Sequence, residues 1–377
     1  MLSKFFYEDF GLRIMMNLYL YKVLEANMRY KYLDSLRGIA CLMVMIAHII
    51  STDSKIGMYA WGCGTVGVWF FMVLAGFLLL YRYLEDDNKN FGVSELPKYY
   101  LGKVLRLVPS YFLAIVMATV MGLINISDWK AHMLLKYGWG HFWYMPVIIK
   151  FYLVAPVILL LYSYLKKKRR GKLFFSAFLL IFFCIISLVF SYKSYPSQSL
   201  TLIWYVPVFI MGMFLAILMH FLSIKSRNAD IFVFIPIISV LIFTPLFRKL
   251  IWGIEPSYYL SNKYMYVGAM WGLFVFFLEK GNVWKSLFEK SIILQKIGDY
   301  SYDIYLVHFI IVIKLSMMGV SNLLLKLLIV IGVSIGFASV LNILRRAWQR
   351  RISSKISISI VVVFYIMFLW GENVFIL

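Results

Sequence analysis

Long apolar stretches recur along the whole chain, and this feature restricts the possible folds more than any other. The 377 residues have a mean hydropathy of +0.83, and 63% of them are hydrophobic while 15% are charged. An apolar run of about 20 residues crosses a bilayer as a helix. Helices satisfy their own backbone hydrogen bonds in lipid, and the runs are continuous rather than alternating as in a membrane β-barrel. The sequence therefore predicts an all-α, polytopic membrane helix bundle.

Eleven membrane-spanning helices are predicted from these runs. They cover 35–51, 61–80, 104–124, 142–164, 173–190, 200–222, 231–247, 264–279, 300–317, 321–344 and 356–371. Residues 1–30 form an amphipathic segment that is expected to lie at the cytosolic membrane interface rather than to cross. Residues 346–377 are expected to form a loop and one additional span after a membrane domain over 31–345. No cleavable signal peptide is recognised, since the first long span is internal.

Basic residues are distributed unevenly between the two sides of this predicted topology. With a cytosolic N-terminus, the inner segments hold 26 Lys and Arg and the outer loops hold 7. This is the positive-inside pattern of membrane proteins. The formal net charge of +21 is therefore attributed to topology, and nucleic-acid binding is excluded. The three cysteines are scattered without ligand or pairing spacing, so neither a metal site nor a disulfide is expected.

The first predicted span carries two polar side chains on one face. Arg37 and His48 are eleven residues apart, which is close to three helical turns and about 16 Å along the axis. An ionisable group within a span is a functional candidate because it is costly in lipid. Arg37 alone is also explained by snorkelling towards the headgroups, and His48 alone by a structural hydrogen bond in the core.

The chemistry that suits this pair is acyl or proton transfer. Histidine titrates near neutral pH, so it can take a proton from an attacking hydroxyl. Arginine stays charged and binds phosphate or carboxylate through two parallel hydrogen bonds. A long ligand held by its phosphates at Arg37 would present its reactive end at His48, and a pantetheine arm has about that reach.

Five sequence segments, the first of which contains Arg37 and His48, match one known family in the same order along the chain. They are "YLDSLRGIACLMVMIAH", "GVWFFMVLAGFLLL", "KVLRLVPSYFL", "HFWYMPVIIKFYLVAP" and "IGDYSYDIYLVH". Taken together, over about residues 31–345, this series resembles the acyltransferase-3 family of integral-membrane O-acyltransferases. Each segment alone is a weak signal, whereas five in order are specific.

The resemblance implies a ten-helix core in a bacterial plasma membrane and a reaction without a bound cofactor. The family usually takes acetyl from cytosolic acetyl-CoA and passes it to a hydroxyl of an envelope polysaccharide or glycolipid. His48 resembles the essential base and Arg37 its partner in donor binding. Lys103 and Arg106 fall on the family's paired-arginine motif, where they would bind the donor's phosphates, although both also suit an anchor in an inner loop.

A second group of residues resembles the family's acceptor pocket. Tyr305 lies one turn before His308 on the same helix face, and His308 is expected either to orient substrate or to form a structural hydrogen bond between helices. Trp143 and Tyr144, with His141, are predicted at the outer membrane interface, as belt residues or as a stacking surface for a sugar. Two other histidines are expected at the surface: His132 and His220.

Three departures from the family pattern affect the expected chemistry. Ala75 stands where the family commonly has serine, which excludes a serine nucleophile there. Lys103 replaces the first arginine of the pair, so charge is kept without the guanidinium fork. Ile148 and Ile149 stand where one branch carries glutamates, which leaves His48 the better candidate base.

Two other classes of function fit the same intramembrane charges. A transporter or flippase for an envelope glycan or lipid intermediate would line its path with Arg37 and His48, and would move substrate without consuming acyl-CoA. A protein that only organises envelope glycan assembly would need neither side chain.

Overall fold

The computed structural model of the protein describes most of the chain. The described residues are 30–60, 62–84, 89–168, 170–191, 200–222, 228–242, 244–253 and 263–351. The predicted interfacial segment over 1–30, except Tyr30, and the predicted last span over 356–371 lie outside them. No strand occurs in the described ranges, and the all-α prediction is confirmed.

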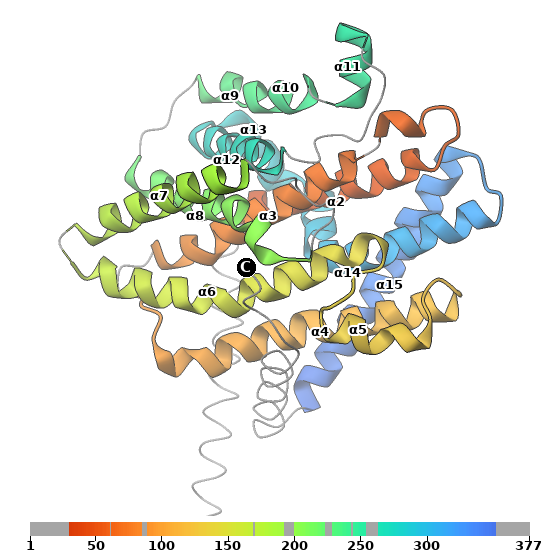
Figure 1. Ribbon diagram of the computed structural model, residues 1–377, viewed down its shortest axis with the longest axis horizontal. Helices are drawn as coiled ribbons and strands as arrows, with labels where there is room; N and C mark the ends of the chain where they lie inside the picture. The colour runs from red at the N-terminus through yellow and green to blue at the C-terminus, as the bar shows by residue number, and fades with distance from the viewer. Residues whose placement is uncertain are drawn as a thin grey trace, which may run out of the picture.

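Figure 1 shows the helices and their arrangement in the bundle. The first half contains α2 (Lys31–Ser51), α3 (Cys63–Leu84), α4 (Leu96–Val120), α5 (Trp129–Met133), α6 (Tyr144–Lys166), α7 (Gly171–Ser191) and α8 (Val206–Phe221). The second half contains α9 (Ala229–Phe232), α10 (Phe234–Ile242), α11 (Pro245–Trp252), α12 (Tyr264–Lys280), α13 (Val283–Lys290), α14 (Ile292–Met317) and α15 (Leu323–Arg351). Three-residue and four-residue 3₁₀ turns precede several of these helices, among them η1 (Gly57–Ala60) and η4 (Gly140–Trp143).

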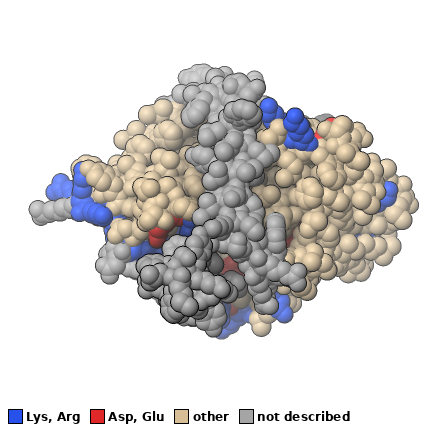
Figure 2. All heavy atoms as spheres, turned by 90° about the horizontal axis from the view of Figure 1, so that it is seen from below, with Lys and Arg blue, Asp and Glu red and all other residues tan. Residues whose placement is uncertain are grey.

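A helix overlaps each of the ten predicted spans that fall within the described residues. Six helical stretches are long and apolar enough to cross a membrane: Lys31–Ser51, Gly57–Leu84, Val93–Val120, Gly140–Lys166, Ile292–Met317 and Leu323–Leu344. A seventh span would combine Ala229–Ile242 with Pro245–Trp252. Figure 2 shows Lys and Arg mainly near the edges of one face, with uncharged residues over most of its described surface. The protein is an integral, multi-pass membrane protein.

The structure differs from the predicted spans at several places. The predicted helix over 231–247 is bent by 81° between Ile242 and Pro245, where proline begins α11 because its fixed φ suits a first helical turn. The helix expected from 200 begins only at Val206, after a 3₁₀ turn over Leu202–Trp204. The predicted inner loop over 280–299 contains α13 and the first turns of α14, because its polar residues are compatible with helices outside lipid.

Glycines bring α2 and α14 into backbone contact. A Cβ at Gly298 would overlap the carbonyl oxygen of Asp34, and one at Gly38 would overlap that of Leu294. Small residues allow such close approach between membrane helices, where packing rather than the hydrophobic effect drives association. This contact fixes the register between the two helices that carry the candidate histidines.

A second glycine contact joins α3 to α8. A Cβ at Gly76 would overlap the carbonyl oxygen of Phe209, and one at Gly212 would overlap that of Val73. Helices α2 and α3 also pack on each other. Backbone contacts that leave no room for a side chain therefore join α2 to α14 and α3 to α8.

Replacing Gly298 by alanine is expected to destabilise the fold, since the new Cβ has backbone rather than a flexible side chain in its way. Overpacking of this kind costs about 1–3 kcal/mol. Thermal unfolding in detergent should show a lower midpoint for Gly298→Ala than for the wild type. Gly332→Ala in α15 is the matched control, because no atom of a neighbouring described residue lies within 4 Å of a Cβ there. Equal midpoints for the two variants would contradict the packing described for α2 and α14.

Candidate active site

Two histidines from helices far apart in the sequence are hydrogen-bonded to each other. His48 Nδ1 on α2 lies 2.9 Å from His308 Nε2 on α14. Their rings are nearly parallel, with 5.2 Å between centroids and 7° between planes. His308 is buried, whereas His48 is partly exposed. The backbone contact at Gly38 and Gly298 holds the two helices close enough for this bond.

The bonds around His308 determine which nitrogen of each ring carries hydrogen when both rings are neutral. His308 Nδ1 lies 2.7 Å from the carbonyl oxygen of Tyr305 and 3.2 Å from that of Ile304. A carbonyl oxygen only accepts, so Nδ1 carries the hydrogen and His308 Nε2 is an acceptor. His48 Nδ1 must then donate to it, which leaves an unprotonated Nε2 on His48. That atom has no hydrogen-bond partner among the described residues.

His141 is a third histidine of the same cluster. Its ring centroid lies 5.2 Å from that of His308, and its Nε2 donates to the carbonyl oxygen of Leu306 at 2.9 Å. Its Nδ1 is buried without a hydrogen-bond partner among the described residues. Sequence reasoning expected His141 at the outer membrane interface, but only 3% of its surface is exposed. The ring of Phe309 packs against both His48 and His141.

The predicted pocket residues divide into two groups. Tyr305 lies beside His308, with 5.7 Å between ring centroids, and its hydroxyl donates to the carbonyl oxygen of His141. Tyr144 packs on Tyr305 at 5.6 Å. Trp143 is buried and packs on Tyr205 of the connection before α8, with 5.3 Å between centroids. Tyr144 and Tyr305 thus lie with the histidines, whereas the Trp143 ring packs on the start of α8.

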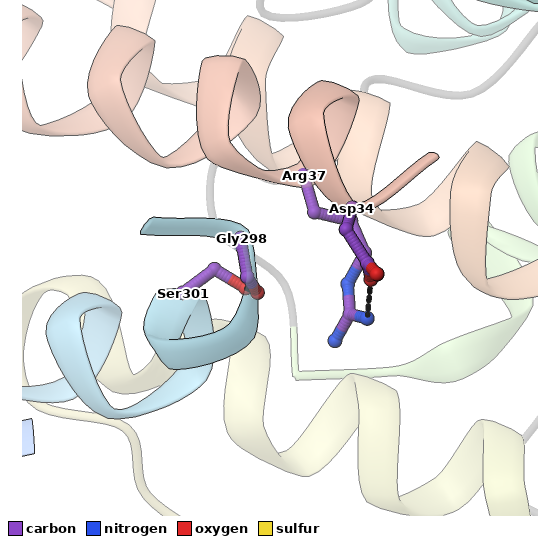
Figure 3. Close-up of polar contacts among 4 residues, drawn as sticks. All are labelled: Asp34, Arg37, Gly298 and Ser301. Carbon is purple, nitrogen blue, oxygen red and sulfur yellow. Dashed lines mark hydrogen bonds and ion pairs between the residues drawn. The ribbon is translucent and has the colours of Figure 1, made fainter. Parts of the chain in front are cut away.

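Arg37 lies three helical turns before His48 on α2 and forms an ion pair within its own helix. Its Nη1 lies 3.3 Å from Asp34 Oδ1. Figure 3 shows both side chains extending from the same side of α2, with the guanidinium beside the carboxylate. The Arg37 side chain keeps 20% of its surface exposed. Sequence reasoning missed this pair, although the i, i+3 spacing is a recognisable signal.

The two predicted donor-binding residues of α4 have different surroundings. Lys103 Nζ lies 3.7 Å from the ring centroid of Tyr152 on α6 and 5.6 Å from that of Tyr99. A small pocket beside it is lined by Lys103, Tyr152 and Ile149 among others. Arg106 is exposed. The two cations therefore sit on one helix, with Lys103 against α6 and Arg106 at the surface.

A buried lysine of α15 meets the end of α2 that follows His48. Lys326 Nζ donates to Thr52 Oγ1 at 2.9 Å and to Ser316 Oγ at 3.1 Å. Next to it, the backbone N–H groups of Lys55 and Ile56 donate to Asp53 Oδ1. These bonds hold the pKa of the Asp53 carboxyl below its usual value. The loop after α2 is thus fixed by polar contacts close to the histidine pair.

The prediction that His132 is a surface group is wrong. The residue is fully buried, and its Nδ1 lies 3.1 Å from the hydroxyl of Tyr111. Burial lowers the pKa of His132. The short helix α5 lies in the connection after α4, and hydrogen bonds join this connection back to α4, which apolar periodicity alone does not reveal. His220 is exposed, as expected, with its Nε2 3.0 Å from Lys172 Nζ.

The sequence predicts that Arg37 and His48 share one face of α2, but it does not predict the pairing of His48 with His308. The expected alternatives for His308 included a hydrogen bond between helices, and its partner is the candidate base itself. Within the described residues, no group of three or more His, Cys, Asp or Glu is arranged to hold a metal ion. The arrangement offers a proton acceptor, a residue that fixes its tautomer, and an arginine on the helix that carries the acceptor.

One of three comparisons with known proteins finds a match. A comparison with curated proteins finds no match, and neither does one with solved structures. A family model for an acyltransferase domain matches residues 30–343, which include α2, α14 and every residue of the candidate site. The chain therefore belongs to the acyltransferase-3 family and is a membrane acyltransferase.

Proposed function

We propose that the protein is an O-acetyltransferase of the bacterial plasma membrane, with its N-terminus in the cytosol. Its donor is acetyl-CoA from the cytosol, and its acceptor is a hydroxyl of a cell-envelope polysaccharide or glycolipid. The observation that carries the proposal is the hydrogen bond between His48 Nδ1 and His308 Nε2. It leaves Nε2 of His48 ready to accept a proton on the helix that also carries Arg37.

In the proposed reaction His48 acts as general base. Its Nε2 takes the proton of the acceptor hydroxyl while the hydroxyl oxygen attacks the thioester carbonyl. The carbon–sulfur bond then breaks, and the leaving thiolate takes the proton back from His48. The products are the acetyl ester and free CoA. General base catalysis of this kind contributes typically 10²–10⁴-fold, and holding both substrates in place supplies the rest of the rate.

His308 acts through His48 rather than on substrate. When His48 has taken the proton, its imidazolium still donates from Nδ1 to the Nε2 lone pair of His308. The Tyr305 carbonyl oxygen, 2.7 Å from His308 Nδ1, keeps His308 in the accepting tautomer. This is the orienting role that a third group plays behind a catalytic base. His308 is therefore proposed as a positioning residue.

The donor is proposed to lie along α2. The phosphates of the donor would contact Arg37, Lys103 and Arg106, since guanidinium and ammonium groups bind phosphate through charge-assisted bonds. From Arg37 to His48 the axis of α2 spans about 16 Å. A pantetheine arm would cover that distance and present the thioester at Nε2. Tyr144 and Tyr305 line the path between them.

Replacing Arg37 by glutamine is expected to raise the KM for acetyl-CoA. A hydrogen bond to a charged group contributes about 1.5–3 kcal/mol, which corresponds to roughly a 10–150-fold loss of affinity. Steady-state kinetics measures the KM for acetyl-CoA at several salt concentrations. Added salt screens the attraction between Arg37 and phosphate, so it should raise the wild-type KM more than that of the variant. Lys55→Gln is the control, since Lys55 is exposed at the other end of α2. An unchanged KM in Arg37→Gln would remove Arg37 from the donor site.

Mass analysis of surface glycans tests the proposed acceptor. Envelope polysaccharides and glycolipids from host cells with and without this chain are compared for acetyl esters. Cells that contain the chain should carry an ester that cells without it lack, and an alkaline wash should remove it. Identical glycans and lipids from both cells would overturn the envelope acceptor.

A further inference from the structure

Gly64 lies directly beside the nitrogen that takes the proton in the proposed reaction. It belongs to the first turn of α3 and is buried. A Cβ at this position would lie 3.2 Å from His48 Nε2 and 3.4 Å from its Cδ2. A hydroxyl bonded to Nε2 would hold its oxygen at about 2.8 Å. A methyl group on residue 64 would therefore compete for space with an acceptor hydroxyl.

Other glycines of this segment have structural reasons that Gly64 lacks. Gly62 has a φ of +73°, a backbone conformation that favours glycine. A Cβ at Gly67 would lie 2.7 Å from the carbonyl oxygen of Ala40, and one at Gly76 would overlap that of Phe209. Both of these glycines allow close approach of neighbouring helices.

The three atoms nearest to a Cβ at Gly64 all belong to side chains. They are the imidazole of His48 and, at 3.8 Å, the Cβ of Ala47. Neither backbone approach nor positive φ demands glycine there, and glycine is unfavourable inside a helix compared with alanine. Glycine thus occupies a position in the first turn of α3 where a Cβ would lie against His48 Nε2.

We propose that Gly64 is a specificity-determining residue that keeps the space at His48 Nε2 open for the acceptor. The bare Cα admits a hydroxyl on a branched carbon, such as that of a sugar ring, alongside the imidazole. A larger residue would leave room only for a small nucleophile. This inference rests on the proposed function, because it assumes that His48 Nε2 receives the acceptor's proton.

The test compares a large and a small acceptor with the same donor. Full-length wild-type and Gly64→Ala proteins are assayed with acetyl-CoA and either the host's envelope glycans or hydroxylamine. Gly64→Ala should lower kcat/KM for the glycans by about 10²-fold, the scale of a 1 Å misplacement of reactants. It should lower the rate with hydroxylamine far less and leave the KM for acetyl-CoA unchanged. Rates are measured on the monodisperse fraction of each purified protein, so that misfolded or aggregated protein does not lower the measured rate of acetyl transfer.

Two matched variants separate the possible outcomes. Gly332→Ala adds the same methyl group where nothing in the described part of the chain lies within 4 Å, and it should behave as wild type with both acceptors. Equal activity of Gly64→Ala and wild type on the glycans would overturn the inference, as would an equal loss with both acceptors. If His48→Ala also transfers acetyl normally, the proposed function itself fails. If His48→Ala is inactive while Gly64→Ala is normal, only the role of Gly64 is lost.

Discussion

Replacing His48 by alanine is expected to reduce acetyl transfer by roughly 10²–10⁴-fold, the contribution of a positioned general base. The reason lies in the tautomer that the surrounding bonds impose. His48 Nδ1 donates to His308 at 2.9 Å, so the proton from the acceptor arrives at Nε2. Among the described residues, no other side chain is hydrogen-bonded to His48 or His308 and could replace His48 Nε2 as the proton acceptor. The measurement is kcat with labelled acetyl-CoA at saturating donor.

Two further variants distinguish lost chemistry from a damaged fold. His48→Gln keeps a polar side chain of similar length in the cluster but has no group that titrates near neutral pH, and it should be as inactive as His48→Ala. His220→Ala removes an exposed histidine of α8 and should leave kcat unchanged. Thermal midpoints close to wild type for the two His48 variants would show that the bundle is intact. Full activity in either variant would exclude His48 as the base.

Replacing His308 by alanine is expected to have the second largest effect, because His48 would lose the acceptor that fixes its tautomer. A catalytic histidine held in the wrong tautomer in a serine protease triad loses about 10⁴-fold in kcat. We expect a loss of kcat on the order of 10²–10⁴-fold for His308→Ala, with the KM for acetyl-CoA unchanged. Steady-state kinetics with both substrates varied separates these two parameters.

His308→Gln is the conservative variant for this test. Its side-chain carbonyl is an acceptor that can take the hydrogen of His48 Nδ1, and it should recover part of the activity that alanine loses. A role limited to packing would make the two variants alike, since neither restores the ring stacked on His48 at 5.2 Å. Kinetics in which alanine and glutamine at 308 perform equally would therefore contradict the positioning role.

Most of the fold follows from the apolar runs. Each run becomes a helix because lipid offers no partner for backbone groups, and positions such as 35–51 are set within a few residues by where polarity begins. The bend before Pro245 and the early start of α14 at Ile292 escape this reasoning. The bend occurs where a proline begins α11 after an apolar helix, and α14 starts early because its first turns are polar enough to be helical outside lipid. Hydropathy marks neither place.

The candidate site was predictable only where its residues share one helix. Arg37 and His48 align because the helical period is regular, and no tertiary information is needed. The bond from His48 to His308 joins residues 260 positions apart, and it depends on backbone contact at Gly38 and Gly298, which a single sequence does not reveal. The burial of His141 beside them has the same origin, because a polar residue near a predicted interface gives no sign of which helices will cover it.

We propose that this acyltransferase moves acetyl from acetyl-CoA to an acceptor hydroxyl, with His48 as the base. The direct measurement follows both products in vesicles that contain the purified protein, acetyl-CoA with a labelled acetyl group, and the host's envelope glycans. Wild-type protein should place label on the glycans and release free CoA in equal amount, and His48→Ala should do neither. Movement of glycan across the vesicle without release of CoA, as a flippase predicts, or equal labelling by His48→Ala would contradict the claim.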